Sequence, residues 1–297
     1  MTNLDTLSLE SAALLQNASI EVMPRTLNKI DNLSALLPGA RQVFIAHIEG
    51  VPFDDMLSCA IRLRNEGFEP VPHITARTLT SKAEIQDHLA RYRGEAGIEA
   101  ALVLAGGTAR THGPFDSSMS LLETGVFDAA GLKTLFVAGH PEGNPVLKAD
   151  SHAVVLEAAR WKHDFAERSD THITLVTQFV FDPEPVIAWK SALQSENIGL
   201  PIRIGLAGPA RLQTLIRYGL SCGVGPSLGV LQRRAKDVTK LLKPQDPSSL
   251  LTALAAHGAG QAGNQISGVH IFPLGGIAAA AEFVTKSRHS VSAKPAA

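Results

Sequence analysis

Residues 43–75 of the chain read VFIAHIEGVPFDDMLSCAIRLRNEGFEPVPHIT. The apolar runs at 43–48 and 69–75 predict two strands. The segment between them begins at Pro52, carries two aspartates in its first turn and apolar residues at helical spacing, and ends at Gly67, which predicts a helix. A strand, a helix and a second strand in this order form the unit from which parallel sheets are built.

The same alternation of short apolar runs and helical segments continues along the chain. Ser81 and Glu84 form the capping-box pattern that begins a helix, and another helical segment follows Pro209 and ends at Gly219. Eight strands in one alternating series, without a Pro/Ser-rich linker or a sequence repeat, favour a closed (β/α)8 barrel over an open sheet. The predicted strands are 18–23, 43–48, 69–75, 100–105, 133–138, 172–180, 202–207 and 268–274.

This pattern predicts a single α/β barrel domain over residues 1–286, a size typical of (β/α)8 barrels. The segment 221–267 has the length and spacing for two extra helices before the last strand. Residues 287–297, SRHSVSAKPAA, are predicted to form a flexible C-terminal tail.

Composition argues against several classes of partner. The chain has 27 basic and 28 acidic residues and no basic block interleaved with aromatics, so nothing indicates nucleic acid. No apolar run approaches the roughly 20 residues that cross a bilayer, so no membrane partner is expected. Cys59 and Cys222 form no C-x-x-C pair and the first twenty residues lack a secretory pattern, which favours a reducing cytoplasm.

Polar residues at strand ends are the candidates for chemistry, because (β/α)8 barrels carry their active sites at the strand carboxyl ends. Glu21 interrupts the first run, where apolar neighbours would raise its pKa and suit it to general-acid work. A salt-bridged structural glutamate explains Glu21 equally well. His73 ends the third run with Thr75 on the same strand face, and a hydrogen-bonded structural histidine is the alternative.

Three further strand ends carry polar or glycine-rich sequence. AGGTARTHG (105–113) would let a ligand approach backbone amides, although a tight turn explains its glycines as well. VAGHPEGNP (137–145) places His140 and Asn144 in a rigid polar loop, typical of a binding site. Gln178 offers a donor and an acceptor to a heterocycle, or else bonds the backbone.

The 11 histidines raise the question of a metal site. They lack ligand spacing, with no H-x-H on the first strand and no H-E-x-x-H, so the sequence indicates no metal. Walker loops and G-x-G-x-x-G after a strand are also absent from the sequence. The chemistry is therefore expected to come from a cofactor or from acid–base residues.

Five motifs in order resemble the methylenetetrahydrofolate reductase family: IEVMP (20–24), PHIT (72–75), the glycine turn after the fourth strand, AGHPEGNP (138–145) and TQFVFD (177–182). The resemblance spans roughly residues 18–275. It implies a (β/α)8 barrel that binds FAD, takes hydride from NADH or NADPH, and interconverts 5,10-methylenetetrahydrofolate and 5-methyltetrahydrofolate. It also implies a homo-oligomer.

The resemblance assigns roles residue by residue. Glu21 matches the general acid that opens the five-membered ring of the folate, and Gln178 matches the glutamine that binds the pterin. The residues placed at the flavin or nucleotide are His73, Thr75, Ala105, Gly106, Gly107, Thr108, Phe115, Asp116, His140, Asn144, Arg160 and Lys162.

Two places depart from the family pattern. Gly107 stands where the family usually has aspartate, and loss of that carboxylate would raise the reduction potential of a neighbouring flavin. Gly275 and Gly276 replace an arginine after the last strand. Alternatives therefore stay open: a flavin-independent reductase of the same folate, a non-redox folate-binding methyltransferase-type barrel, and a non-catalytic barrel.

Overall fold

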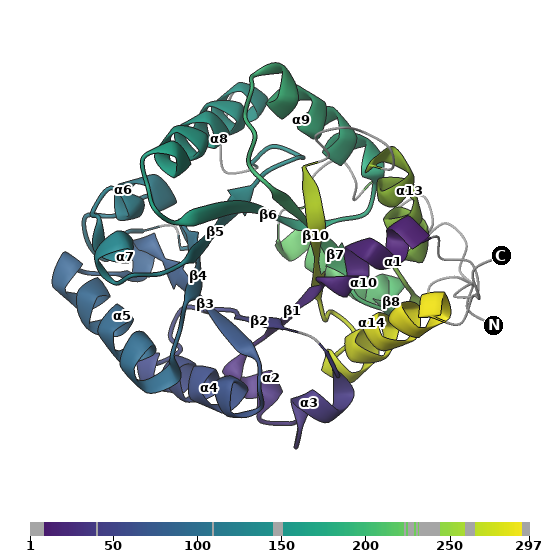
Figure 1. Cartoon of the computed structure of the whole chain (residues 1–297), viewed down its shortest axis with the longest axis horizontal. Helices are drawn as coiled ribbons and strands as arrows, with labels where there is room; N and C mark the ends of the chain where they lie inside the picture. The colour runs from purple at the N-terminus through teal and green to yellow at the C-terminus, as the bar shows by residue number, and fades with distance from the viewer. Residues whose placement is uncertain are drawn as a thin grey trace.

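The computed structural model describes residues 9–39, 41–108, 110–144, 151–222, 224, 229, 231, 244–258 and 265–292. Eight strands, all parallel, close into a barrel, and helices surround it (Figure 1). The predicted (β/α)8 fold is thereby confirmed. The barrel strands are β1 (Ser19–Val22), β2 (Gln42–Ile45), β3 (Glu69–Thr75), β4 (Ala100–Leu104), β5 (Thr134–Gly139), β6 (His172–Val180), β7 (Ile202–Ala207) and β10 (Ile266–Phe272).

The helices follow the strands in the expected alternation. They are α1 (Leu9–Gln16), α2 (Pro24–Leu27), α3 (Leu33–Leu36), α4 (Phe53–Asn65), α5 (Lys82–Ala96), α6 (Ser118–Leu122), α7 (Val126–Ala129), α8 (Ser151–Glu167), α9 (Pro183–Ser195), α10 (Leu212–Ser221), α13 (Ser248–Gly258) and α14 (Ile277–Ser292), with the 3-10 turn η2 (Ala76–Thr78).

Predicted strand boundaries agree with the observed ones in β3, β6 and β7. The second strand ends at Ile45, earlier than predicted, although Ala46 N still donates to Val22 O at 2.8 Å. The last strand begins at Ile266, earlier than predicted, and a bulge between Ile266 and Gly268 leaves the polar Ser267 without a register partner on β7.

The predicted helix starts are confirmed. α4 begins directly after Pro52. Ser81 caps α5 by accepting a hydrogen bond from Glu84 N at 3.2 Å. The Glu84 carboxylate also accepts hydrogen bonds from Thr80 N and Thr80 Oγ1, at 2.7 and 2.6 Å.

The elements before the last strand are partly within the described residues. α13 matches one of the two extra helices predicted for 221–267, while 232–243 and 259–264 lie outside the described residues. The sequence did not predict the short antiparallel pair of β8 (Ala210–Arg211) and β9 (Pro244–Gln245). α10 continues past Gly219 to Ser221.

The C-terminal boundary is corrected by α14, which runs to Ser292 through the start of the predicted tail 287–297. Its buried residues, among them Ala280 and Val284, belong to the main core, and the helix contacts α1 and α3. Packing therefore holds this segment in a helix. Residues 293–297 lie outside the described part.

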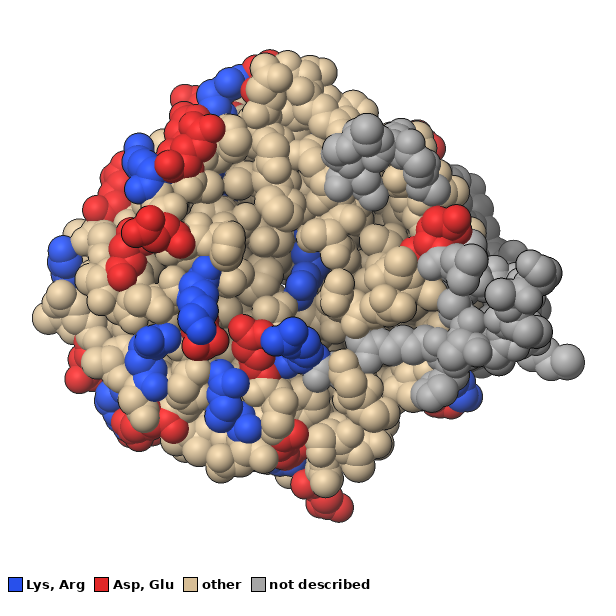
Figure 2. All heavy atoms as spheres, in the orientation of Figure 1, with Lys and Arg blue, Asp and Glu red and all other residues tan. Residues whose placement is uncertain are grey.

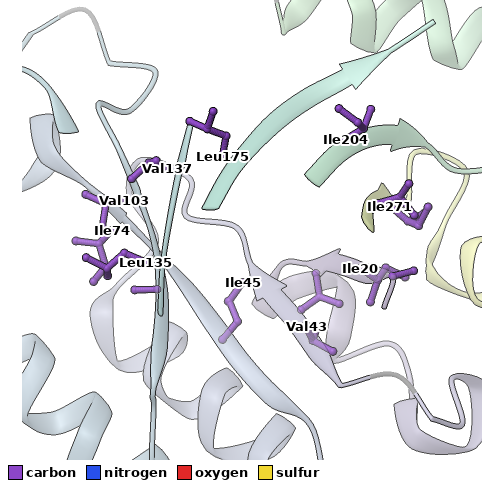
Figure 3. Close-up of a cluster of buried hydrophobic side chains, with 14 of the residues drawn as sticks. Ile20, Val43, Ile45, Ile74, Val103, Leu135, Val137, Leu175, Ile204 and Ile271 are labelled. Carbon is purple, nitrogen blue, oxygen red and sulfur yellow. The ribbon is translucent and has the colours of Figure 1, made fainter. Parts of the chain in front are cut away.

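Two apolar layers hold the barrel. Side chains that every barrel strand contributes pack against the surrounding helices, and Figure 3 labels examples from Ile20 to Ile271. A second, smaller cluster is contributed by alternating positions of five barrel strands: Phe44, Val71, Ala100, Leu102, Phe136 and Val176. This second cluster fills the middle of the barrel. Burying each large apolar side chain contributes about 1.5–3 kcal/mol to the stability of the fold.

The surface matches the near-neutral composition. On the face that Figure 2 shows, basic and acidic side chains are interspersed, mainly over the left and lower parts of the view. The formal net charge is −1. None of the described helices is both long and apolar enough to span a membrane.

Candidate functional site

A cavity of about 870 Å³ opens at the carboxyl ends of the strands, the position predicted for an active site. The apolar layer inside the barrel forms its floor through Leu102 and Val176. Its walls come from strand ends, from the start of α2 and from the end of α10, where Tyr218 and Cys222 line it. A volume in the range of roughly 300–1,000 Å³ is typical of pockets that enclose one small-molecule ligand.

Glu21 lies at the junction of this floor and wall, between two histidines. Its Oε2 is 3.5 Å from His73 Nε2 and 3.7 Å from His270 Nε2. β1 pairs with β10, which carries His270, and β2 links β1 to β3, which carries His73. Side chains alternate between the two faces of a strand, and all three of these point into the barrel. The carboxyl group is 19% exposed, at the cavity surface.

Burial sets the charges in this cluster. Burial raises the pKa of Glu21 above its usual value, against the opposing influence of His73. Burial lowers the pKa of His73 to about 4, and burial with the positive Arg203 nearby lowers the pKa of His270 to about 3. Both imidazoles are therefore neutral near pH 7, so the predicted alternative of a Glu21 salt bridge to a cation is not what the described structure contains.

Gln178 reaches the cavity through an irregularity in β6. The pairing of β6 with β7 shifts between Val176 and Phe179, and such bulges redirect side chains. The Gln178 side chain is exposed at the cavity, with its Oε1 accepting from Phe179 N at 3.0 Å. Thr177 Oγ1 accepts from Gly205 N at 2.9 Å, which holds the bulge in place.

Two residues expected at the flavin line the same cavity, namely His73 and His140. Burial, followed by the charge of Lys162, lowers the pKa of His140 to about 4, so this side chain is also neutral near pH 7. Thr75 instead lines a smaller cavity of about 250 Å³ between β3 and the helices α4 and α5. There its Oγ1 lies 3.2 Å from His47 Nδ1. His47 and His73 line both cavities.

The remaining positions expected around FAD do not line the described cavities. One group of them forms a turn beside Thr75, namely Ala105, Gly106, Gly107 and Thr108. Arg77 Nη1 donates a hydrogen bond to Thr108 O and so supports this turn. Phe115 is buried in the main core and the Asp116 carboxylate bonds Ser120 at the start of α6. Asn144 lies outside both cavities and directly precedes residues that are not described.

The two basic candidates on α8 are corrected by the structure. Arg160 is exposed on the outer side of the barrel and forms an ion pair with Glu196. Lys162 is buried, and its Nζ donates to Ala138 O at 2.6 Å. Burial lowers the pKa of Lys162 to about 8. α8 is oriented so that Arg160 points toward the end of α9 and Lys162 points toward β5. Both side chains therefore bind other residues of the protein.

The glycine substitutions have different steric causes. A side chain at Gly275 would place its Cβ 1.9 Å from Pro209 O, so the arginine of the family pattern cannot be accommodated at this position. Gly276 has φ 106°, which favours glycine. At Gly107 no heavy atom lies within 4 Å of an added Cβ, so space does not explain the absence of the expected aspartate.

Sequence reasoning missed His270, which completes the pair of histidines around Glu21. The alternation of outward Val269 and Ile271 in the last run was the available signal, since it turns His270 toward the barrel interior. No local signal marks Tyr218 and Cys222, because they reach the cavity only through the placement of α10. Among the described residues, no group of three His, Cys, Asp or Glu side chains could hold a metal ion.

The residues present do not fit FAD in the way the family resemblance implies. Of the expected flavin contacts, His73 and His140 are the two that face the large cavity. Arg160 and Lys162 are engaged elsewhere, and the loop at 105–108 faces neither described cavity.

Comparison with solved structures places this fold among known barrels. An uncharacterized protein from Clostridium thermocellum that binds two copies of 5-methyl-5,6,7,8-tetrahydrofolic acid matches with a TM-score of 0.59 and 14% identity, over 92% of this chain and 94% of that chain. The 7,8-dihydropteroate synthase from Vibrio fischeri ES114 matches with a TM-score of 0.46 and 10% identity, over 95% and 96% of the two chains. No protein-family model matches the sequence. At these identities the likeness shows the barrel fold.

Proposed function

We propose that the large cavity binds a reduced folate and that the chain interconverts 5,10-methylenetetrahydrofolate and 5-methyltetrahydrofolate, with a nicotinamide nucleotide as hydride donor. One observation carries the proposal: a carboxyl group with a raised pKa, Glu21, stands at the edge of an apolar cavity floor. An acid held protonated by burial can supply a proton near neutral pH.

The chemistry requires such an acid at one step. Reduction of the methylene bridge breaks its bond to N10 of the folate, and that nitrogen needs a proton. Glu21 supplies the proton and becomes a carboxylate, while hydride adds to the methylene carbon to give the N5-methyl group. The donor leaves as the oxidised nicotinamide, so electrons and protons balance. His73 and His270 lie beside the carboxylate and carry no positive charge near pH 7.

The cavity supports a folate by shape and by polar groups. Gln178 can pair with the donors and acceptors of a pterin ring, while the floor at Leu102 and Val176 is apolar. The Clostridium thermocellum barrel of similar fold binds 5-methyltetrahydrofolic acid, and the ordered motifs of this chain resemble a folate reductase family. These observations are independent of each other.

The hydride is proposed to come directly from the nicotinamide, because the residues present do not fit FAD. A flavin-dependent form is the second candidate. It is favoured by the family resemblance and by His73 and His140, which face the cavity where the resemblance expects flavin contacts. The absorbance spectrum of the purified protein separates the two forms, since a bound flavin absorbs in the visible region and a bound folate does not.

The test is an anaerobic reaction of purified protein with 5,10-methylenetetrahydrofolate and either NADH or NADPH. We expect oxidation of one donor together with formation of 5-methyltetrahydrofolate. Donor oxidation that requires a flavin in the spectrum supports the second candidate. Absence of the methyl product with both donors, in flavin-loaded as well as flavin-free protein, would overturn the proposed reaction.

Folate binding has a separate readout at Cys222. This thiol is exposed and lines the cavity, while Cys59 is buried, so an alkylating reagent should modify Cys222 first. We expect 5-methyltetrahydrofolate to slow that modification, and Cys222→Ser to remove it. Protection without any nicotinamide oxidation indicates a non-redox folate barrel. Unchanged modification at saturating folate would contradict binding in this cavity.

A further inference from the structure

The residues around Glu21 include a buried pair that the family resemblance did not assign. β1 and β10 are paired so that Ser19 lies opposite His270. Ser19 Oγ and His270 Nδ1 are 2.8 Å apart, and both residues are about 1% exposed. The other ring nitrogen of His270, Nε2, lies 3.7 Å from Glu21 Oε2.

Hydrogen-bond accounting assigns the tautomer of His270. Among the described residues, His270 Nδ1 is the one partner recorded for the Ser19 hydroxyl. A buried hydroxyl proton left without an acceptor is costly, so Ser19 donates to Nδ1. A neutral imidazole carries one N–H, and it therefore lies on Nε2. That atom is buried and makes no hydrogen bond within the described structure, and it faces Glu21.

Aromatic packing fixes the direction of this N–H. The His270 ring lies 4.5 Å from the Phe44 ring and 4.7 Å from the Phe272 ring, measured between centroids. Both phenylalanines are held in the barrel interior or its upper wall. The imidazole has little room to turn, so Nε2 keeps its direction while Glu21 changes charge.

We propose that His270 is a positioning residue for Glu21. Ser19 fixes the tautomer of His270, and the Nε2–H of His270 donates a hydrogen bond to the carboxylate that forms when Glu21 gives up its proton. The inference rests on the proposed function for its chemical meaning. A neutral hydrogen-bond donor can stabilise the carboxylate once it forms. A neighbouring cation would instead favour loss of the Glu21 proton before the reaction. The 3.7 Å separation shortens as charge develops, which is usual for catalytic hydrogen bonds.

The titratable groups near this pair come from several elements. Facing Glu21 are His73 on β3, His270 on β10 and Cys222 after α10, while His47 acts on His73, Arg203 acts on His270, and Lys29 lines the cavity wall. None of the other groups contacts both Ser19 and Glu21. The effect of the Ser19–His270 pair can therefore be separated from theirs by substitution.

The experiment measures Glu21 and His270 directly, in protein without substrate. Nitrogen-15 NMR of the imidazoles should show His270 with a proton on Nε2 and a bare Nδ1. Carbon-13 NMR of the glutamate carboxyls, with Glu21→Gln for assignment, should give the titration of Glu21. We expect His270→Phe, which keeps an aromatic ring, to raise the pKa of Glu21 by about one unit. Ser19→Ala should raise it by less.

Ser118→Ala is the matched control, because Ser118 is a buried serine on α6 outside the cavity. It should leave the titration of Glu21 unchanged. A proton on His270 Nδ1, or a Glu21 titration that is unmoved or lowered in folded Ser19→Ala protein, would overturn the proposal. If His270→Phe does not fold, the Ser19→Ala titration and the wild-type tautomer still decide it. None of these readings needs turnover, so a failure of the proposed reaction is seen separately.

Discussion

Two clusters of polar side chains lie inside the same barrel, at opposite ends of its apolar layer. At the amino-terminal end, Arg203 Nη1 donates to Gln42 Oε1 at 2.7 Å, and Gln42 Nε2 donates to Glu69 Oε2 at 3.1 Å. The Arg203 guanidinium also lies 5.2 Å from the Phe136 ring centroid. At the carboxyl end, Glu21 has neutral imidazoles beside it at 3.5 and 3.7 Å.

The difference separates a stabilising cluster from a reactive one. Burial lowers the pKa of Arg203 to about 10, yet Glu69 opposes that change and the side chain remains charged and bonded. No lysine or arginine of the described residues forms an ion pair with Glu21, and burial raises its pKa. A group whose charge is compensated stabilises the fold, whereas a group kept neutral by burial is available for proton transfer.

The largest effect is expected for Glu21→Gln. The amide keeps the shape but cannot give a proton, so turnover of methylenetetrahydrofolate should fall by roughly 10²–10⁴-fold. Stability in urea should change by less than about 1 kcal/mol, because the amide keeps the size and shape of the side chain. The control is Glu69→Gln at the other end of the barrel, which should retain turnover within a few-fold. Equal losses of turnover in Glu21→Gln and Glu69→Gln would contradict the assignment of the reactive cluster to the carboxyl end of the barrel.

The converse change is Arg203→Met. Removing the guanidinium leaves Gln42 Oε1 without its donor and removes the positive charge near Glu69, so the free energy of unfolding should fall by about 2–3 kcal/mol. Turnover at saturating substrate should stay near wild type. Arg160→Met is the control, since its exposed ion pair with Glu196 should contribute about 0–1 kcal/mol. Urea unfolding of both variants measures the difference, and similar losses would contradict the structural role of Arg203.

A smaller effect is expected at the bulge that directs Gln178. A Cβ at Gly205 would lie 2.5 Å from Thr177 O, so Gly205→Ala must displace β6 and should cost about 1–3 kcal/mol. We also expect weaker protection of Cys222 by 5-methyltetrahydrofolate. Gly199→Ala is the matched control, because its Cβ would meet no atom within 4 Å. Wild-type stability and folate protection in Gly205→Ala would show that the bulge does not position Gln178.

The smallest effect is a dependence of stability on pH. His73 and His270 have folded-state pKa values of about 4 and about 3, below the ordinary 6.5. Their contribution is therefore full above pH 6.5 and is lost as the pH falls toward those values. Between pH 7 and 6 the loss should be on the order of 1 kcal/mol.

Glu21 acts with the opposite sign and needs a separate measurement. Its raised pKa makes its contribution full below about 4.5, and that contribution is lost as the pH rises through the folded-state value. Urea titrations should therefore be run in the Glu21→Gln background, which isolates the histidines. Adding His270→Phe should then reduce the slope against pH. A slope that is unchanged in the double variant would contradict burial of a neutral His270.

Much of the fold could be predicted, because strand positions depend on local apolar runs. β3, β6 and β7 were predicted at their observed bounds, because β-branched and apolar residues are frequent in each run. α14 was cut short in the prediction because 287–292 are polar and lack a helix signal of their own.

The candidate site could be predicted in part. Glu21, His73, His140 and Gln178 lie at the large cavity as the strand-end rule suggested. Thr75 faces the smaller cavity because the strand ends there and the chain turns into η2, so alternation no longer applies. The prediction that Arg160 lies at the cofactor was wrong, because packing sets the rotation of α8 and so decides which of its side chains face outward.

The sequence by itself determined the order of strands and helices, their closure into a barrel, and the presence of a carboxylate at the end of the first strand. Each follows from short-range patterns of apolar and polar residues. Only the tertiary structure decided that Ser19, Glu21, His73 and His270 meet, since strand register joins residues about 250 positions apart. It also decided that the pKa of Glu21 is raised, because desolvation belongs to the assembled barrel interior and to no single segment.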